Sequence, residues 1–141
     1  MVSGSCLCGG IRFEYARAVT GVGLCHCSLC RKVSGSASSA AIVVPENDLK
    51  WLSGEELRQT FVKPSGWSTT FCRTCGSLVP EKYRRGAAYL VPAGLLDDDP
   101  GLRISGHIFV GSKAPWDEIG GSAPQFEEGI HPPSREPTPS F

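Results

Sequence analysis

Seven cysteines carry the most distinctive chemistry of this sequence, and they fall in three tight clusters that lie far apart along the chain. A Cys-x-x-Cys turn points two thiolates inward, and an extended Cys-x-Cys places both side chains on one face of the pleat. These spacings are typical of metal ligands, and an odd number of cysteines cannot all form internal disulfides. The clusters are Cys6 with Cys8, Cys25 with Cys27 and Cys30, and Cys72 with Cys75.

Thiolate ligands in these numbers favour zinc, which takes four ligands in a structural site and three plus an open position in a catalytic one. The favoured partition closes a site with Cys6, Cys8, Cys72 and Cys75 and leaves Cys25, Cys27 and Cys30 as three ligands around a vacancy. The other partition combines the middle cluster with one outlying cysteine and leaves the rest in poor geometry. Reduced cysteines that pack as small apolar groups, and an iron–sulfur cluster, are the alternatives to zinc.

An open zinc with three thiolates suits binding of a substrate thiol better than polarisation of a carbonyl, because thiolates reduce the Lewis acidity of the metal. Coordination lowers the pKa of a thiol from ~8.5 and makes the bound sulfur nucleophilic. Arg31 and Lys32 follow Cys30 directly and could hold the anionic site, or they could be ordinary surface charges.

Other polar and aromatic residues near the motifs have less specific interpretations. Alternation turns His26 away from a metal held by its two neighbours, which favours a packed, hydrogen-bonded histidine over a ligand. His107 begins an apolar stretch and is expected to be a core histidine, with a proton donor as the alternative. The sequence Asp97–Asp99 indicates a turn rather than a metal cage. Trp67 and Trp116 could line a pocket for a peptide-like thiol, although ordinary packing is their default role.

The elements that must position the cysteines are predicted to be short strands. Residues 11–15 alternate as in a half-buried strand, and Pro45 ends a β-branched stretch over residues 38–44. Helical periodicity is scarce, and the best short candidates are residues 28–33 and a turn near residues 55–57. These patterns predict a mainly β fold. The remaining candidate strands are 49–52, 59–63, 68–72, 88–91 and 107–110.

Composition and charge exclude several classes of protein. The chain has 141 residues with 14 basic and 14 acidic side chains, so its net charge is zero, which argues against a nucleic-acid partner and a polybasic membrane patch. We find neither a secretory signal nor a membrane span, so a cytoplasmic location is expected. The predicted organisation is one zinc-binding β domain over residues 1–128 and a proline-rich tail over residues 129–141.

Taken together, five stretches resemble the glutathione-dependent formaldehyde-activating enzyme family, also called the centromere protein V family. They occur in the family's order and cover about residues 4–127. The stretches are Gly4-Ser-Cys-Leu-Cys-Gly-Gly, Cys25-His-Cys-Ser-Leu-Cys-Arg-Lys-Val-Ser-Gly, Phe71-Cys-Arg-Thr-Cys-Gly-Ser, Gly94-Leu-Leu-Asp-Asp-Asp, and His107-Ile-Phe-Val with Ala114-Pro-Trp.

The resemblance implies short-stranded sheets around a zinc-ribbon-like core, of the Mss4-like type. It implies two zinc ions per chain, a structural one on Cys6, Cys8, Cys72 and Cys75 and a catalytic one on Cys25, Cys27 and Cys30. The family's activity is a carbon–sulfur lyase chemistry that condenses glutathione with formaldehyde, as in an S-hydroxymethylglutathione synthase. The implied partners are therefore a small thiol and an aldehyde, and a homo-oligomer is compatible with the sequence. The alternative function is a zinc-stapled binding or scaffold module without catalytic turnover.

Overall fold

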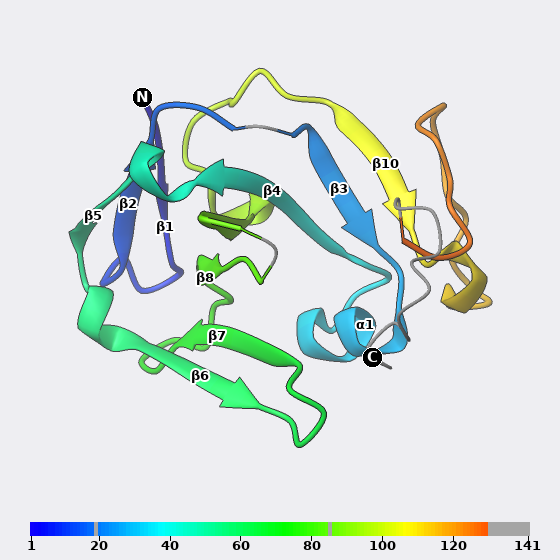
Figure 1. Ribbon diagram of the computed structural model, residues 1–141, viewed down its shortest axis with the longest axis horizontal. Helices are drawn as coiled ribbons and strands as arrows, with labels where there is room; N and C mark the ends of the chain where they lie inside the picture. Colours follow the sequence, from blue (N-terminus) through cyan, green and yellow to red (C-terminus); the bar gives the residue numbers. More distant parts are fainter. Residues whose placement is uncertain (19, 85, 130–141) are drawn as a thin grey trace.

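Three small β-sheets and one short helix make up the described part of the chain, which in this computed structural model comprises residues 1–18, 20–84 and 86–129 (Figure 1). The first sheet has the order β1-β2-β5 and the second has the order β10-β3-β4-β9-β8, while β6 and β7 form a separate antiparallel hairpin. Among the named strands of the described residues, β10 and β3 are the pair that runs in parallel. This architecture confirms the predicted mainly β fold with short strands.

The strands are short, and single turns of 3-10 helix (η) connect several of them. The elements are β1 (Val2–Ser5), β2 (Arg12–Tyr15), β3 (Val22–Cys25), α1 (Ser28–Ser34), β4 (Ser39–Pro45), η1 (Glu46–Asp48), β5 (Leu49–Ser53), η2 (Glu55–Leu57), β6 (Arg58–Val62), β7 (Ser68–Cys72), β8 (Glu81–Lys82), β9 (Ala88–Pro92), η3 (Ala93–Leu95), β10 (Ile104–Ile108) and η4 (Val110–Ser112).

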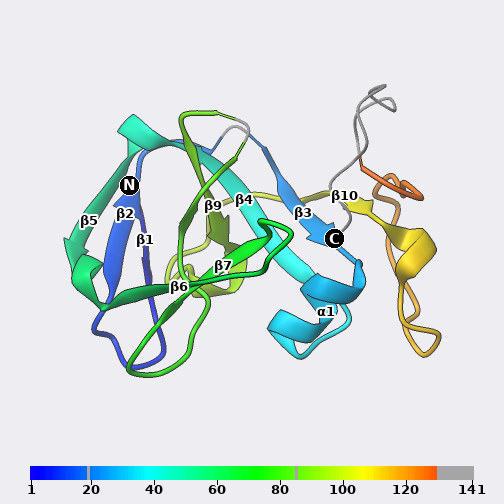
Figure 2. The same ribbon diagram turned by 60° about the horizontal axis from the view of Figure 1, so that its bottom comes forward.

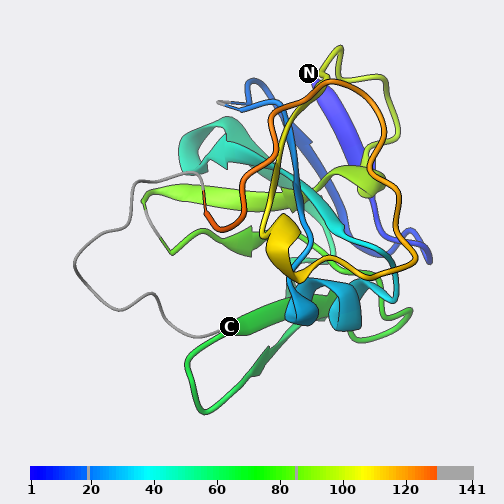
Figure 3. The ribbon, with the colours of Figure 1, turned by 90° about the vertical axis from the view of Figure 1, so that its right-hand side faces the viewer.

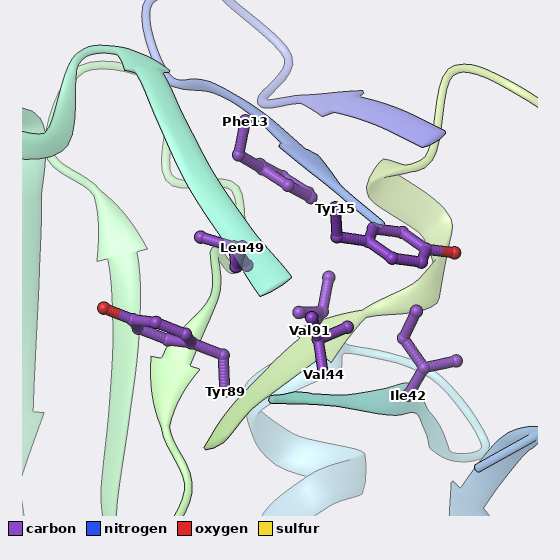
Figure 4. Packing of buried hydrophobic residues seen from close by; sticks show 7 residues of the cluster. All are labelled: Phe13, Tyr15, Ile42, Val44, Leu49, Tyr89 and Val91. Carbon is purple, nitrogen blue, oxygen red and sulfur yellow. The ribbon is translucent and has the colours of Figure 1, made fainter. Parts of the chain in front are cut away.

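The main hydrophobic core lies between the first and second sheets (Figure 4). Alternate residues of each strand point into it, as the two-residue period of a pleated strand requires. Phe13, Ile42, Val44 and Val91 are fully buried there, so this core fixes the position of the second sheet against the first. The buried members are Phe13 and Tyr15 from β2, Ile42 and Val44 from β4, Leu49 from β5, and Tyr89 and Val91 from β9.

A second, smaller core is built partly from cysteines. Cys6 and Cys72 pack with Ile11 and Val79, and all four side chains are buried. Cys6 follows β1 in the first sheet, and Cys72 ends β7 in the hairpin. This cluster therefore joins two sheets that share no strand.

Helix α1 is separated from β3 by His26 and Cys27 and is defined by caps at both ends. Cys27 is the N-cap, and its sulfur accepts a hydrogen bond from the Cys30 amide at 3.4 Å. Gly35 ends the helix in the left-handed conformation with φ of 63°, which glycine adopts without the steric cost that other residues incur. The predicted helix over residues 28–33 is thus confirmed.

The last described segment runs back along the edge of the second sheet. The His107 amide donates to the Pro124 carbonyl, and the Phe126 amide donates to the His107 carbonyl, each at 2.8 Å. In Figure 3 this segment, coloured orange, runs beside η4 on the side that faces the viewer. Residues 130–141, which make up almost all of the predicted tail, lie outside the described residues, and the predicted division into domain and tail stays a prediction.

The strand predicted over residues 107–110 was misplaced, because β10 runs from Ile104 to Ile108. Phe109 has a φ of 56°, which takes the chain out of the strand and into η4. The Phe109 amide donates to the Glu128 carbonyl at 3.0 Å, so a tertiary contact helps to hold this conformation. None of the helices in the described residues is long and apolar enough to cross a membrane.

Candidate metal centres

The first cysteine cluster brings together the two pairs that sequence reasoning assigned to the closed site. The sulfurs of Cys6, Cys8, Cys72 and Cys75 all lie within 4.8 Å of one another. The Cys6 and Cys8 sulfurs are 3.5 Å apart, and those of Cys8 and Cys72 are 3.9 Å apart. A tetrahedron with zinc–sulfur bonds of ~2.3 Å has edges of about 3.8 Å. The donor set and its spacing therefore fit a four-thiolate zinc.

Hydrogen bonds from the surrounding backbone and Ser77 support thiolates in this cluster. The Ile11 amide donates to the Cys6 sulfur at 3.3 Å. The Ser77 hydroxyl lies 3.3 Å from the Cys75 sulfur, and together with the Ser77 amide it lowers the pKa of Cys75 to about 5. The same hydroxyl oxygen accepts a hydrogen bond from the Leu7 amide at 2.9 Å. Ser77 therefore connects the segment of Cys6 and Cys8 with the segment of Cys72 and Cys75.

Two carboxylates, which the sequence analysis assigned only to a turn, help to position the segment that carries Cys6 and Cys8. Asp98 accepts hydrogen bonds from the amide and the hydroxyl of Ser3, which lower its pKa, and Asp97 accepts from the Ser5 hydroxyl. These bonds fasten β1 immediately before Cys6. The acidic turn therefore supports a strand that is far from it in sequence, and the sequence alone did not predict this contact.

The second cluster holds the three remaining cysteines at the junction of β3 and α1. The sulfurs of Cys25, Cys27 and Cys30 lie within 4.8 Å of one another, and in the described residues no His, Asp or Glu completes the group as a fourth ligand. All three are free cysteines. This donor set fits three bonds to a zinc ion with a fourth position open.

In the second cluster, the pKa shifts favour a thiolate at Cys27 over thiolates at Cys25 and Cys30. Hydrogen bonds from the Cys25 and Cys30 thiols, and from the Cys30 and Leu29 amides, lower the pKa of Cys27. The pKa of Cys25 is raised mainly by its hydrogen bond with Cys27. The pKa of Cys30 is raised mainly by its hydrogen bond with Cys25. A cation would relieve this competition because it stabilises all three thiolates at once.

The two clusters lie at separate places in the fold. Figures 1 and 2 show the β1–β2 loop on one side of the β6–β7 hairpin and α1 on the other. The first cluster combines the β1–β2 loop with the end of β7, whereas the second lies where β3 meets α1. Loss of one site therefore need not remove the other.

The two histidines lie behind the second cluster rather than in it. In the parallel pairing of β10 with β3, His107 lies opposite Leu24 and Ile108 lies opposite Cys25. Because side chains alternate along a strand, His107 shares a face with Leu24, opposite to Cys25. His26, the first residue after β3, lies against His107. His26 Nε2 lies 2.9 Å from His107 Nδ1, and burial is the main cause that lowers the pKa of His26. His26 is thus packed and hydrogen-bonded, as the sequence favoured.

The remaining candidates are not drawn together by the structure. Arg31 is half-buried and Lys32 is exposed, and Trp116 is largely exposed. Neither Trp67 nor Trp116 lines the cavity of about 370 Å³ that lies beside His107. That cavity is formed by Leu102, Arg103, Ile104, His107, Gly120, Gly121, Ser122 and Ala123.

Comparison with known proteins agrees with the fold and the cysteine pattern. The crystal structure of a Rhodobacter sphaeroides protein superimposes with a TM-score of 0.59 at 22% sequence identity, over 87% of this chain and 98% of that chain. The similarity shows a shared fold, and the cysteine clusters are consistent with the Mss4-like type. The family model of the glutathione-dependent formaldehyde-activating enzyme matches residues 1–112. This match contains all seven cysteines and most of the chain, and the protein therefore belongs to that family.

Proposed function

We propose that this protein binds a small thiol such as glutathione at an open three-cysteine zinc and condenses it with formaldehyde or a related aldehyde. One observation carries the proposal: seven cysteines separate into a group of four and a group of three. Zinc held by four thiolates is closed, whereas zinc held by three protein ligands keeps a position for substrate. Family membership supports glutathione and formaldehyde as the substrate classes.

In this proposal the roles divide between Cys25, Cys27 and Cys30 and the residues around them. Zinc would supply a site for the substrate sulfur and lower the pKa of that thiol from ~8.5. The three cysteines hold the site at a fixed place, with Cys27 anchored by its cap of α1. Arg31 and Lys32 lie one and two residues beyond Cys30, and in this proposal their charges would offset part of the negative charge of the thiolates.

The condensation of a thiol with an aldehyde needs few further groups from the protein. The thiol sulfur forms a bond to the aldehyde carbon, the carbonyl π bond breaks, and the proton lost by the thiol ends on the new hydroxyl oxygen. The site therefore contributes mainly orientation and a more acidic thiol. In this view Cys6, Cys8, Cys72 and Cys75 hold a structural zinc and take no part in the chemistry.

The variant Cys27→Ser tests this proposal. We expect it to stay folded, to retain one zinc per chain and to lose glutathione binding, because two thiolates hold zinc poorly. Zinc content, circular dichroism and calorimetric titration with glutathione should be measured together, with Ser36→Ala, an exposed residue after the same helix, as the matched control. A Cys27→Ser protein that keeps two zincs and native glutathione affinity would contradict the proposal. Any rate of condensation must be compared with the spontaneous reaction of formaldehyde with the same thiol.

A binding module without turnover is the second candidate, and the β6–β7 hairpin favours it. Phe61 and Val62 on β6 are 55% and 59% exposed, and β6 pairs only with β7 in the described sheets. Strands of this kind can take up a partner along their open edge. One inert zinc per chain would favour this module, whereas two zincs, one of them easily removed by a mild chelator, would favour the enzyme.

A further inference from the structure

His26 lies in sequence between two of the three cysteines of the second cluster, and its side chain contacts His107 and Asp117. It is 2% exposed, directly follows β3 and lies against His107. Its Nε2 lies 2.9 Å from His107 Nδ1, and its Nδ1 lies 3.3 Å from Asp117 Oδ2. Both nitrogens of this buried ring therefore face a polar group from another part of the chain.

The two groups that hold His26 are themselves fixed. His107 is 4% exposed, and its backbone is bonded on both sides to the segment 124–126. Asp117 closes a turn in which its amide donates to the Ala114 carbonyl at 3.0 Å, and Lys113 Nζ donates to the Asp117 carbonyl at 2.9 Å. The turn is anchored by Ala114, which is 1% exposed.

The proton positions follow from the donors and acceptors available. A carboxylate can only accept, so the proton on His26 Nδ1 is assigned to the side that faces Asp117 Oδ2, which lies at an ion-pair distance of 3.3 Å rather than in a closed hydrogen bond. His26 Nε2 is then an acceptor, and the Nδ1–H of His107 donates to it. This arrangement places a donor toward Asp117 and an acceptor toward His107, and it favours one orientation of the His26 ring.

Fixing His26 also fixes the backbone that carries two metal ligands. The His26 amide donates to the Ile108 carbonyl at 3.0 Å, so both the main chain and the side chain of this residue are anchored to β10 and the segment beyond it. Cys25 and Cys27 are its direct neighbours. A three-ligand site depends on the position of each sulfur, because no fourth protein ligand compensates for a displaced one.

We propose that His107 and Asp117 act as positioning residues, which clamp His26 and thereby hold Cys25 and Cys27 in the geometry that binds metal. Neither residue contacts the sulfurs as a ligand in this arrangement; both act through the backbone of residues 25–27. The inference rests on the second metal site of the proposed function. It also gives a role to the segment after residue 112, which lies beyond the family match.

The test compares the affinities of the two metal sites in full-length variants. Removing a group that orients metal ligands typically costs about 10- to 100-fold in metal affinity. We expect Asp117→Ala to lose zinc affinity by that factor at the three-cysteine site and to keep it at the four-cysteine site. Competition with a chromophoric chelator reports both affinities, and the charge-transfer spectrum of the cobalt-substituted protein shows which thiolate site is empty.

Rescue and control variants separate positioning from general damage to the fold. Asp117→Asn keeps an oxygen acceptor for His26 and should restore most of the affinity, and Glu118→Ala, at the exposed neighbouring position, should leave both sites unchanged. His107→Leu removes the other contact and carries the same expectation if Asp117→Ala does not fold. Equal weakening of both sites, or no weakening in a folded variant, would overturn the inference. A wild-type protein that binds a single zinc would overturn the proposed function as well, so the two failures are distinguishable.

Discussion

Ser77 shows how one side chain outside the ligand set can tune a thiolate site. Its hydroxyl lies 3.3 Å from the Cys75 sulfur and also accepts a hydrogen bond from the Leu7 amide. A thiolate sulfur can only accept, so the hydroxyl donates to it and is the largest of several causes, the Ser77 amide among them, that lower the pKa of Cys75 to about 5. The site thereby keeps one ligand deprotonated at a pH where a free thiol is protonated.

Replacing Ser77 with alanine is expected to raise the pKa of Cys75. Protons then compete with zinc at a higher pH, so the midpoint of acid-induced zinc release should move upward by a fraction of a pH unit. Zinc release from the first cluster, measured with a fluorescent chelator during an acid titration, checks this shift. Ser112→Ala, at an exposed serine that belongs to neither cluster, is the control. An unchanged or lower midpoint in Ser77→Ala would contradict the role assigned to Ser77.

At this scale the sequence predicted the metal-binding residue types but not their supports. Cysteine spacing indicated the two groups because the motifs are local in sequence. Ser77 gave no comparable signal although it lies two residues after Cys75, because a serine has many ordinary roles, and Asp117 gave none because it acts on His26, which is close only in the folded chain. Ser77 follows the Cys-x-x-Cys-Gly turn and Asp117 follows Ala114-Pro-Trp, so residues flanking such motifs are the ones to inspect.

Among the elements, β1 determines where the first pair of cysteines lies. Gly4 of β1 pairs with Phe13 of β2, and a Cβ at Gly4 would overlap the Phe13 ring. Phe13 is fully buried in the main core and has no room to move aside. Glycine is therefore required by close packing, two residues before Cys6.

The variant Gly4→Ala is expected to lower the free energy of unfolding by about 1–3 kcal/mol, the usual cost of overpacking a core. Gly94→Ala is the matched control, because a Cβ at Gly94 meets no atom within 4 Å. Chemical denaturation of the zinc-loaded proteins gives both values. Equal stability of the two variants would show that β1 can shift without cost.

Elements with a clear hydrophobic period were predictable, and those without it were not. Residues 11–15 and 68–72 were recognised as strands, and both carry alternating or β-branched side chains. β1 and β3 were missed because Val-Ser-Gly-Ser and Val-Gly-Leu-Cys lack any such pattern. Both strands form through pairing with partner strands. The parallel pairing of β3 with β10 has no local sequence pattern that predicts it.

Across the whole molecule, the four-cysteine site joins parts of the chain that share no sheet. Cys6 belongs to the loop after β1, Cys72 ends β7, and both are buried in the second core. A structural zinc in a small domain contributes folding free energy of order ~10 kcal/mol. The site should therefore act as a main support of the fold.

The variant Cys72→Ser is expected to unfold or aggregate, since it removes a buried ligand from this site. Thermal unfolding followed by circular dichroism, together with zinc content, measures the effect. Cys27→Ser is the comparison, because it changes a cysteine of the other cluster and should remain folded. Full zinc content and unchanged thermal stability in Cys72→Ser would show that the first cluster does not hold a structural metal.

The central claim is that the second zinc keeps a position for a substrate sulfur, and X-ray absorption spectroscopy at the zinc edge tests it most directly. In a protein with one four-thiolate and one three-thiolate zinc, the mean number of sulfur ligands per zinc is about 3.5. Addition of saturating glutathione should raise this mean to about 4, since the added sulfur fills the open position. A mean that does not change on addition of glutathione, in a protein shown to hold two zincs, would contradict the account.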